Sequence, residues 1–240
     1  MMEVAAGETI GPDYVAMLAN DMGYEAKSAV ASKAPTPSSR VRVAVVGAGM
    51  SGLLAGIQLQ RAGIEYTIFE RNPEVGGTWY ESVYPGCGVD TPNHFYNYSF
   101  YANKNWTRYF AKGPEIQKYF VDTANEFVLR GKIRFSTRVT RAAFDESRRL
   151  WTLSLVGPDG KSETHEAEVV IFAVGLFGDA VIPDIPGIKA FAGRVIHTSR
   201  WPKGESIAGK HVVRRAGSRA TATPRISSAR VRSSNFSASS

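Results

Sequence analysis

The strongest local pattern of apolar and polar residues runs from Val43 to Trp79. Val43–Val46 is a short, β-branched apolar run, which indicates a buried strand. Leu53–Arg61 then has helical spacing, and Ile64–Phe69 is a second β-branched run that predicts another strand. The pattern therefore predicts a strand–turn–helix–strand unit.

Later segments predict a helix and further strands. Residues 114–129 carry an amphipathic stripe, which predicts a helix that Gly131 ends. Four short strands are predicted after it, at 132–136, 138–144, 151–156 and 163–170. The last two lie on either side of the turn Gly157–Gly160, so we expect a hairpin. A buried strand at 169–174 would return to the first unit.

A glycine motif connects the first predicted strand to the first predicted helix. Gly47, Gly49 and Gly52 form G-x-G-x-x-G, and Glu70 follows the second strand. Glycines here permit a tight turn, close approach of a pyrophosphate and close packing of helix on strand. The helix N-terminus would offer N–H groups to phosphates, and Glu70 would accept hydrogen bonds from a ribose. An ordinary glycine-rich α/β turn is the alternative.

The candidate cofactor-binding residues of this unit are Gly47, Ala48, Gly49, Met50, Ser51, Gly52, Glu70 and Arg71. An acid at position 70 favours a free ribose and disfavours the extra phosphate of NADP. A second glycine pair, Gly76–Gly77, follows directly and resembles the FAD-binding half of two-dinucleotide flavoproteins. We therefore predict FAD here, and the resemblance implies that Gly77, Thr78 and Trp79 lie along the cofactor. The predicted fold class is α/β, an incomplete Rossmann-like FAD-binding domain with a hairpin or meander insertion.

Composition limits the cellular location and the kinds of site that we expect. Hydrophobic residues make up 43% of the 240, enough for a core, and no apolar run approaches the ~20 residues of a membrane span. The N-terminus lacks a signal pattern, so we expect a cytoplasmic protein without membrane association. Cys87 is the only cysteine, which excludes an internal disulfide or a cysteine metal cluster, and we predict no metal site.

The positive charge is concentrated at the C-terminus. The chain has a net charge of +7, and residues 211–240 hold six arginines and no acid. The remaining residues, 1–210, therefore carry only +1. We expect no nucleic-acid partner for the body of the protein. An arginine-rich nucleic-acid arm remains the alternative for the tail.

A second motif lies between Phe191 and Pro202. Its spacing, F-x-G-x-x-x-H-x-x-x-W-P, is similar to the fingerprint of Baeyer–Villiger monooxygenases, flavoproteins that insert oxygen next to a ketone. GGTWY at 76–80, YPG at 84–86, Asp90 and NYSF at 97–100 also resemble that family. The wording is most similar to the 4-hydroxyacetophenone monooxygenase branch, and the resemblance covers roughly residues 40–213.

The resemblance implies roles for further residues. Asp90 would lie near the flavin and orient a catalytic arginine, while Tyr96 would contact the cofactor and Val139 the adenine. Asp90 and His197 are the candidate catalytic residues. For His197 and Trp201 the resemblance implies a linker that couples domain motion rather than contact with substrate, and a structural histidine remains an alternative. The implied cofactors are FAD and NADP, the implied substrates a small ketone and O2, and a homodimer is left open.

The sequence departs from the family in two places. Gly88 stands where these enzymes usually have arginine. After Val213 no second G-x-G-x-x-G for NADPH follows, and serine, arginine and alanine dominate, so we predict a disordered, aberrant tail produced by a frameshift. The expected division is an N-terminal extension and linker at 1–40, a partial FAD-binding domain at 41–190, an interdomain linker and the start of an NADP domain at 191–213, and the tail at 214–240.

The function that follows is an FAD- and NADPH-dependent Baeyer–Villiger monooxygenase. In the family, NADPH reduces FAD, O2 adds to form a peroxyflavin, and the peroxide converts the ketone to an ester or lactone. We expect negligible turnover from these 240 residues alone. The alternatives are an N- or S-oxygenating flavin monooxygenase, whose fingerprint usually ends in Phe or Tyr where this chain has Trp201, and a non-enzymatic FAD-binding remnant.

Overall fold

A four-stranded parallel sheet forms the centre of the structure, a computed structural model that describes residues 11, 41–176, 179–182, 184 and 186–212. Its strands are β1 (Arg42–Val46), β2 (Glu65–Phe69), β3 (Ile133–Arg134) and β7 (Val169–Phe172), in the order β3-β2-β1-β7. Helix α3 (Met50–Arg61) connects β1 to β2, which pair in parallel. The predicted strand–turn–helix–strand unit is confirmed, and so is the pairing of the later strand with β1. The prediction that this later strand is buried and runs to residue 174 is wrong, because it ends at Phe172, and Val169 and Phe172 are exposed.

A second, antiparallel sheet is inserted before β7. It contains β4 (Arg138–Asp145), β5 (Leu150–Val156) and β6 (Ser162–Ala167), in sequence order. The predicted hairpin is confirmed by the pairing of β5 with β6. The prediction of one continuous strand over 163–170 is wrong, because the chain changes sheets at Glu168: β6 pairs with β5, whereas β7 pairs with β1.

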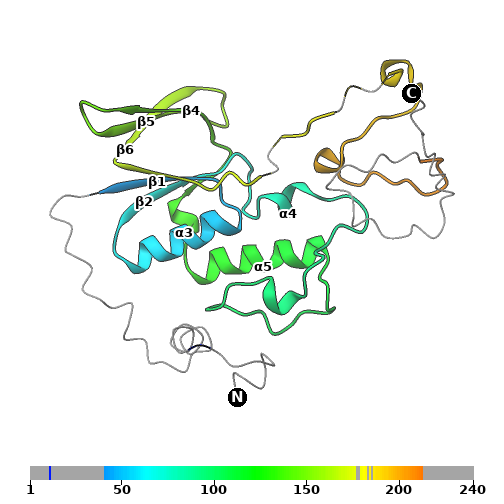
Figure 1. Ribbon diagram of the computed structural model, residues 1–240, viewed down its shortest axis with the longest axis horizontal. Helices are drawn as coiled ribbons and strands as arrows, with labels where there is room; N and C mark the ends of the chain where they lie inside the picture. The colour runs from blue at the N-terminus through cyan, green and yellow to red at the C-terminus, as the bar shows by residue number, and fades with distance from the viewer. Residues whose placement is uncertain (1–10, 12–40, 177–178, 183, 185, 213–240) are drawn as a thin grey trace.

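The three layers are visible in Figure 1, with the antiparallel sheet, the parallel sheet and the helices stacked in that order. Alternation along β1 explains the arrangement, since successive side chains of a strand face opposite sides. Val43 and Val45 pack among the helices, while Ala44 and Val46 pack against Leu153 and other residues of the antiparallel sheet. Strand β1 is therefore buried on both faces, which is why it is apolar throughout.

Helix α5 (Gly113–Glu126) packs beside α3 in the helical layer (Figure 1). The predicted end at Gly131 is wrong. The helix stops at Glu126 because Val128 adopts a φ of +52°, and Leu129 instead turns inward and is fully buried. Gly131 belongs to the short 3-10 turn Arg130–Lys132 that leads into β3.

The remaining elements are short: α4 (Thr78–Glu81) and the 3-10 turns η1 (Asn93–Phe95), η3 (Ile188–Ala190) and η4 (Thr198–Arg200). No helix within the described part of the chain is long and apolar enough to cross a membrane. The predicted N-terminal helix, the linker at 28–40 and the tail at 214–240 lie outside the described residues, and the division into domains stays a prediction.

Candidate functional site

The first glycine turn joins β1 to α3. Gly47 has a φ of +103°, and a Cβ atom there would lie 2.6 Å from the carbonyl oxygen of Ala173 on the neighbouring strand segment. A Cβ atom on Gly52 would lie 1.8 Å from the carbonyl oxygen of Gly47. Both distances are too short for a real side chain, so the tight turn and the close helix packing require glycine at these positions.

The second glycine pair lies directly against this turn. Gly76 and Gly77 have φ values of +117° and +53°. The N–H of Gly76 donates to the carbonyl oxygen of Ala48 at 3.0 Å, and a Cβ atom on Gly77 would lie 3.1 Å from the Cα atom of Gly49. Two turns that are distant in sequence thus form one continuous backbone surface without side chains.

The N-terminus of α3 opens onto this surface. Gly49 is the N-cap residue; its own side chain cannot cap the helix, and the first turn contains no acidic residue. Tyr98, a buried residue, donates its hydroxyl to the carbonyl oxygen of Met50 at 2.6 Å and so fixes the first residue of the helix. The N–H groups and the positive end of the helix dipole at this point suit an anion such as a pyrophosphate.

Glu70 is turned onto the first glycine turn rather than outward. Its carboxylate accepts from the N–H of Ala48 at 2.7 Å and from the N–H of Asn72 at 2.8 Å, and the residue is only 3% exposed. Burial raises the pKa of this carboxyl, although both hydrogen bonds oppose that effect. A carboxylate has further lone pairs, so contact with a ribose stays a prediction, while support of the turn is a role that the sequence did not predict.

Two predicted site residues contact each other beyond the second glycine pair, and a third acts on one of them through its charge. The indole N–H of Trp79 donates to the hydroxyl of Tyr96 at 3.0 Å, with their rings edge-to-face at 5.7 Å. Burial raises the pKa of Tyr96, and the charge of Asp90 acts in the same direction. Asp90 is exposed and accepts a long hydrogen bond of 3.5 Å from Thr91. Among the described residues no arginine forms an ion pair with it.

The backbone leaves no space for a side chain at position 88, where Baeyer–Villiger monooxygenases usually have arginine. Gly88 forms an isolated antiparallel bridge with Lys112, and a Cβ atom on Gly88 would lie 2.6 Å from the carbonyl oxygen of Ala111. Its neighbour Cys87 is buried. The close pairing of this segment with the backbone at Ala111 and Lys112 therefore fits glycine at position 88.

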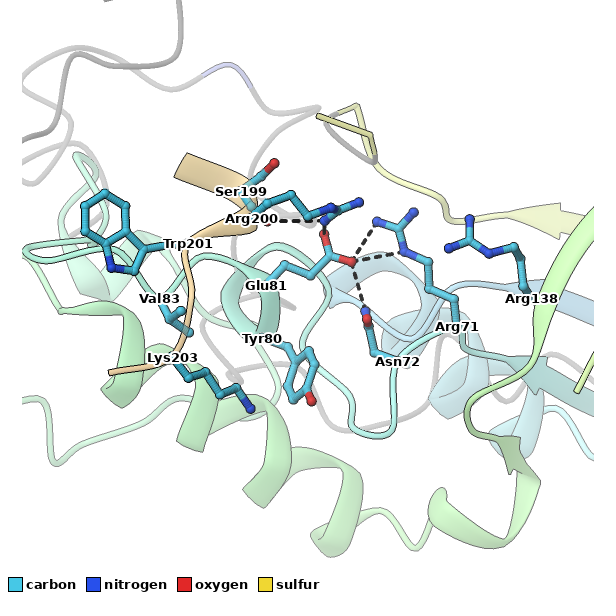
Figure 2. A pocket seen from close by; sticks show the side chains of 10 residues that line it. All are labelled: Arg71, Asn72, Tyr80, Glu81, Val83, Arg138, Ser199, Arg200, Trp201 and Lys203. Carbon is cyan, nitrogen blue, oxygen red and sulfur yellow. Dashed lines mark hydrogen bonds and ion pairs between the residues drawn. The ribbon is translucent and has the colours of Figure 1, made fainter. Parts of the chain in front are cut away.

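Arg71 belongs to a charged cluster around Glu81, the last residue of α4 (Figure 2). Oε1 of Glu81 accepts from Nη2 of Arg71 at 2.7 Å and from Nδ2 of Asn72 at 3.0 Å. Oε2 of the same carboxylate lies 3.5 Å from Nη1 of Arg200, on the later 3-10 turn η4. One carboxylate, 11% exposed, thus joins α4 to Arg71 and Asn72, ten and nine positions earlier, and to Arg200, 119 positions later in the chain.

A cavity of about 430 Å³ adjoins this cluster. Cations dominate its charged lining: Arg71, Arg138, Arg200 and Lys203 line it together with Glu81. Val139, the predicted adenine contact, follows Arg138 in β4, and its side chain packs on the core between the two sheets. Adenine contact by Val139 stays a prediction.

His197 and Trp201 make mainly local contacts in the described structure. The Nδ1 atom of His197 accepts from the N–H of Ser199 at 3.2 Å and lies 2.8 Å from its hydroxyl, so His197 caps η4. The indole N–H of Trp201 donates to the carbonyl oxygen of Glu205 at 3.3 Å. This geometry favours a structural histidine and supplies no contact between His197 and Asp90.

The structure therefore brings the two glycine turns, Glu70 and Trp79 together, whereas the side chain of His197 contacts Ser199. Of the other predicted contact residues, Ser51 and Thr78 are exposed, while Ala48 is buried and uses its N–H on Glu70. The described residues contain no cluster of three or more His, Cys, Asp or Glu side chains that could hold a metal ion. Sequence reasoning missed Glu81 and Tyr98, because Glu81 contacts Arg200, 119 positions away, and Tyr98 contacts Met50, 48 positions away along the chain.

Residues 45–112 match the family of NAD(P)-binding Rossmann-like domains. A protein of Sinorhizobium fredii named as an uncharacterized monooxygenase is 38% identical over 212 residues, which cover 88% of this chain and 32% of that protein. A Baeyer–Villiger monooxygenase of Streptomyces coelicolor is 40% identical over 173 residues, which cover 72% of this chain and 32% of that protein.

Solved structures of monooxygenases are also similar to this chain. The cyclohexanone monooxygenase of Rhodococcus sp. Phi1, bound to NADP+, has a TM-score of 0.65 at 36% identity, covering 72% of this chain and 33% of that chain. A complex of OTEMO with FAD and NADP has a TM-score of 0.65 at 35% identity, covering 72% of this chain and 34% of that chain. The chain therefore spans about a third of the length of these proteins, and over that third it belongs to the flavoprotein monooxygenase family that includes the Baeyer–Villiger enzymes.

Proposed function

We propose that this chain is an FAD-binding part of a Baeyer–Villiger-type monooxygenase. The observation that carries the proposal is the meeting of two glycine turns, one at Gly49 and one at Gly77, at the uncapped N-terminus of α3. A single glycine turn would serve any dinucleotide, whereas the second pair fits the long, extended FAD molecule. Relatives named as FAD-binding monooxygenases and a neighbour solved with FAD support this choice over NAD.

The residues present fit FAD. The surface formed by Gly47, Gly49 and Gly77 carries no Cβ atoms, and the N-terminus of α3 would stabilise the pyrophosphate charge. Glu70 would hold the first turn in shape and accept hydrogen bonds from the ribose. When bound, FAD would supply the redox chemistry with O2 and a small ketone, the substrate class that we propose for the whole protein.

The chain's own residues would orient the cofactor rather than perform the chemistry. Trp79 and Tyr96, joined by a hydrogen bond, would form a rigid wall beside it, and Asp90 would present a negative charge near it. The 240 residues contain one G-x-G-x-x-G, at the proposed FAD site. NADPH binding and ester formation are therefore proposals for the whole protein.

Flavin titration of the purified chain tests the FAD site. Gly49→Val places a branched side chain where the pyrophosphate would approach, so we expect FAD affinity, measured by quenching of flavin fluorescence, to fall at least about tenfold. Gly131→Ala is the matched control, since a Cβ atom at Gly131 meets nothing within 4 Å. If the unaltered chain binds no FAD, or if both variants bind it equally well, the proposal fails.

A further inference from the structure

Gln117 lies on α5, and its side-chain amide faces the second glycine pair. Nε2 of Gln117 donates to the carbonyl oxygen of Val75 at 2.7 Å. Because a carbonyl oxygen only accepts hydrogen bonds, the amide nitrogen must be the atom that faces it. Val75 itself is fully buried in the core. The bond therefore holds the backbone immediately before the glycine pair to the rigid helix.

Gly76 leaves the space that this amide occupies. A Cβ atom on Gly76 would lie 1.9 Å from Oε1 of Gln117, nearer than any real side chain comes to another atom. The N–H of Gly76 is used on the other side, where it donates to Ala48 of the first glycine turn. The second glycine turn is thus held between the helix α5 and the first turn.

The carbonyl end of the same amide is left without a partner. Oε1 of Gln117 is buried and has no hydrogen-bond partner in the described structure. Burying an unpaired polar atom costs free energy, and an apolar side chain of similar shape would avoid that cost. A residue that buries an unpaired polar atom while contacting a candidate functional loop is typically retained for function rather than for stability.

We propose that Gln117 is a positioning residue of the candidate FAD site. Through its bond to Val75 it keeps Gly77 packed against Gly49, and so it sets the shape of the backbone surface that receives the pyrophosphate. Gln117 acts through the backbone and does not touch the cofactor. The effect on ligand binding rests on the proposed FAD site, whereas the effect on the loop does not.

The test compares Gln117→Met with a matched variant, Gln60→Met. Gln60 also donates its Nε2 to a backbone carbonyl, that of Phe127 at 3.0 Å, but at the far end of α3. We expect amide hydrogen exchange at Gly76 to become about five- to tenfold faster in Gln117→Met, because a partly buried hydrogen bond is lost next to it. In Gln60→Met the exchange at Gly76 stays unchanged.

The second readout is the dissociation constant for FAD. We expect this dissociation constant to rise about fivefold in Gln117→Met and less than twofold in Gln60→Met. The two substitutions should change the Tm of the chain by similar amounts. Gln117→Asn is a second variant, which keeps the amide but is one methylene too short to reach Val75. It should reproduce both effects, which assigns them to the lost hydrogen bond rather than to lost polarity.

The outcomes separate cleanly. Unchanged exchange at Gly76 in both Gln117 variants overturns the proposal, and so does a loss of FAD affinity no larger than that of Gln60→Met. If exchange accelerates as expected but the unaltered chain binds no FAD, the loop support by Gln117 stands and the proposed FAD site fails instead. If Gln117→Met does not fold, Gln117→Asn decides by the same criteria.

Discussion

Single side chains hold this structure together at points where the backbone changes direction. Glu168 is the only residue between β6 and β7, where the chain passes from one sheet to the other. Its carboxylate accepts from the backbone N–H of Arg42 at 2.8 Å and from the guanidinium of the same residue at 2.9 Å. These bonds lower the pKa of Glu168 to about 2. The start of β1 is thereby fastened to the crossing point.

This low pKa predicts a dependence of stability on pH. Since the folded-state pKa lies below the ordinary 4.5, the ionised carboxylate stabilises the folded chain above pH 4.5, and that contribution is lost as the pH falls toward about 2. Glu168→Gln should cost about 1 kcal/mol or less at neutral pH, because the side chain is one-third exposed. The cost should shrink in acid.

Urea unfolding at several pH values measures this. Glu146→Gln, which alters an exposed carboxylate in the turn between β4 and β5, is the control and should not change the free energy of unfolding by more than a few tenths of a kcal/mol. A Glu168→Gln variant that stays equally destabilised below pH 3 would contradict the assignment.

At the scale of elements, helix α4 connects the second glycine pair to the later segment that contains Arg200. It is only four residues long, yet it follows the second glycine pair directly and ends on Glu81. Glu81 reaches Arg71 on one side and Arg200 on the other, while Lys203 lies 5.1 Å from the ring of Tyr80. The segment that contains His197 and Trp201 is therefore held to the same helix that continues the candidate cofactor turn.

Glu81→Leu should loosen that segment. We expect cleavage by trypsin after Lys203 in the native state to become about fivefold faster or more, because the loss of charge-assisted hydrogen bonds at a mostly buried carboxylate favours local opening. Glu166→Leu, which removes an ion pair with Arg148 on the antiparallel sheet, is the control and should leave this cleavage unchanged. Equal rates in the two variants would show that Glu81 does not hold the segment.

Elements that depend on local patterns were predictable from the sequence. The β1–α3–β2 unit and the β5–β6 hairpin follow from periodicity and turn residues over short windows. The break at Glu168 was not predictable, because residues 163–170 contain no glycine or proline that marks a turn, and only the choice of partner strand divides them. The early end of α5 depends in the same way on where Leu129 packs, a tertiary effect.

The candidate site was predictable only in part. Glycines at 47, 49 and 52 predict a dinucleotide-binding turn, because the backbone of such a turn requires glycine at this spacing. The support by Gln117 left a weaker signal, a polar residue within the apolar stripe of α5, next to the buried Ile116. The Glu81 cluster left none, since it is completed by Arg200, 119 positions later in the chain. Roles for Asp90, Tyr96 and Val139 stay predictions.

At the scale of the whole molecule, the chain carries one G-x-G-x-x-G turn, and its match spans only about a third of the relatives' length. We therefore expect the purified 240 residues to oxidise NADPH at the background rate in the presence of FAD, O2 and a ketone. The full-length Baeyer–Villiger monooxygenase of Streptomyces coelicolor is the positive control in the same assay. NADPH consumption coupled to ester formation by this chain alone would contradict the expectation. Homodimer formation and a cytoplasmic location also stay predictions.

The pairing of β1 with β7 has a consequence for how the chain is made. Val43 and Val169, which pair in the parallel sheet, are 126 positions apart. At the usual speed of translation, about 5–20 residues per second, the central strand waits about 6 to 25 s for its second neighbour to leave the ribosome. During that time an apolar strand keeps one edge open, which is the kind of surface that chaperones protect and that aggregates recruit. Synthesis rate and chaperone supply, rather than final stability, would then govern the yield of folded protein.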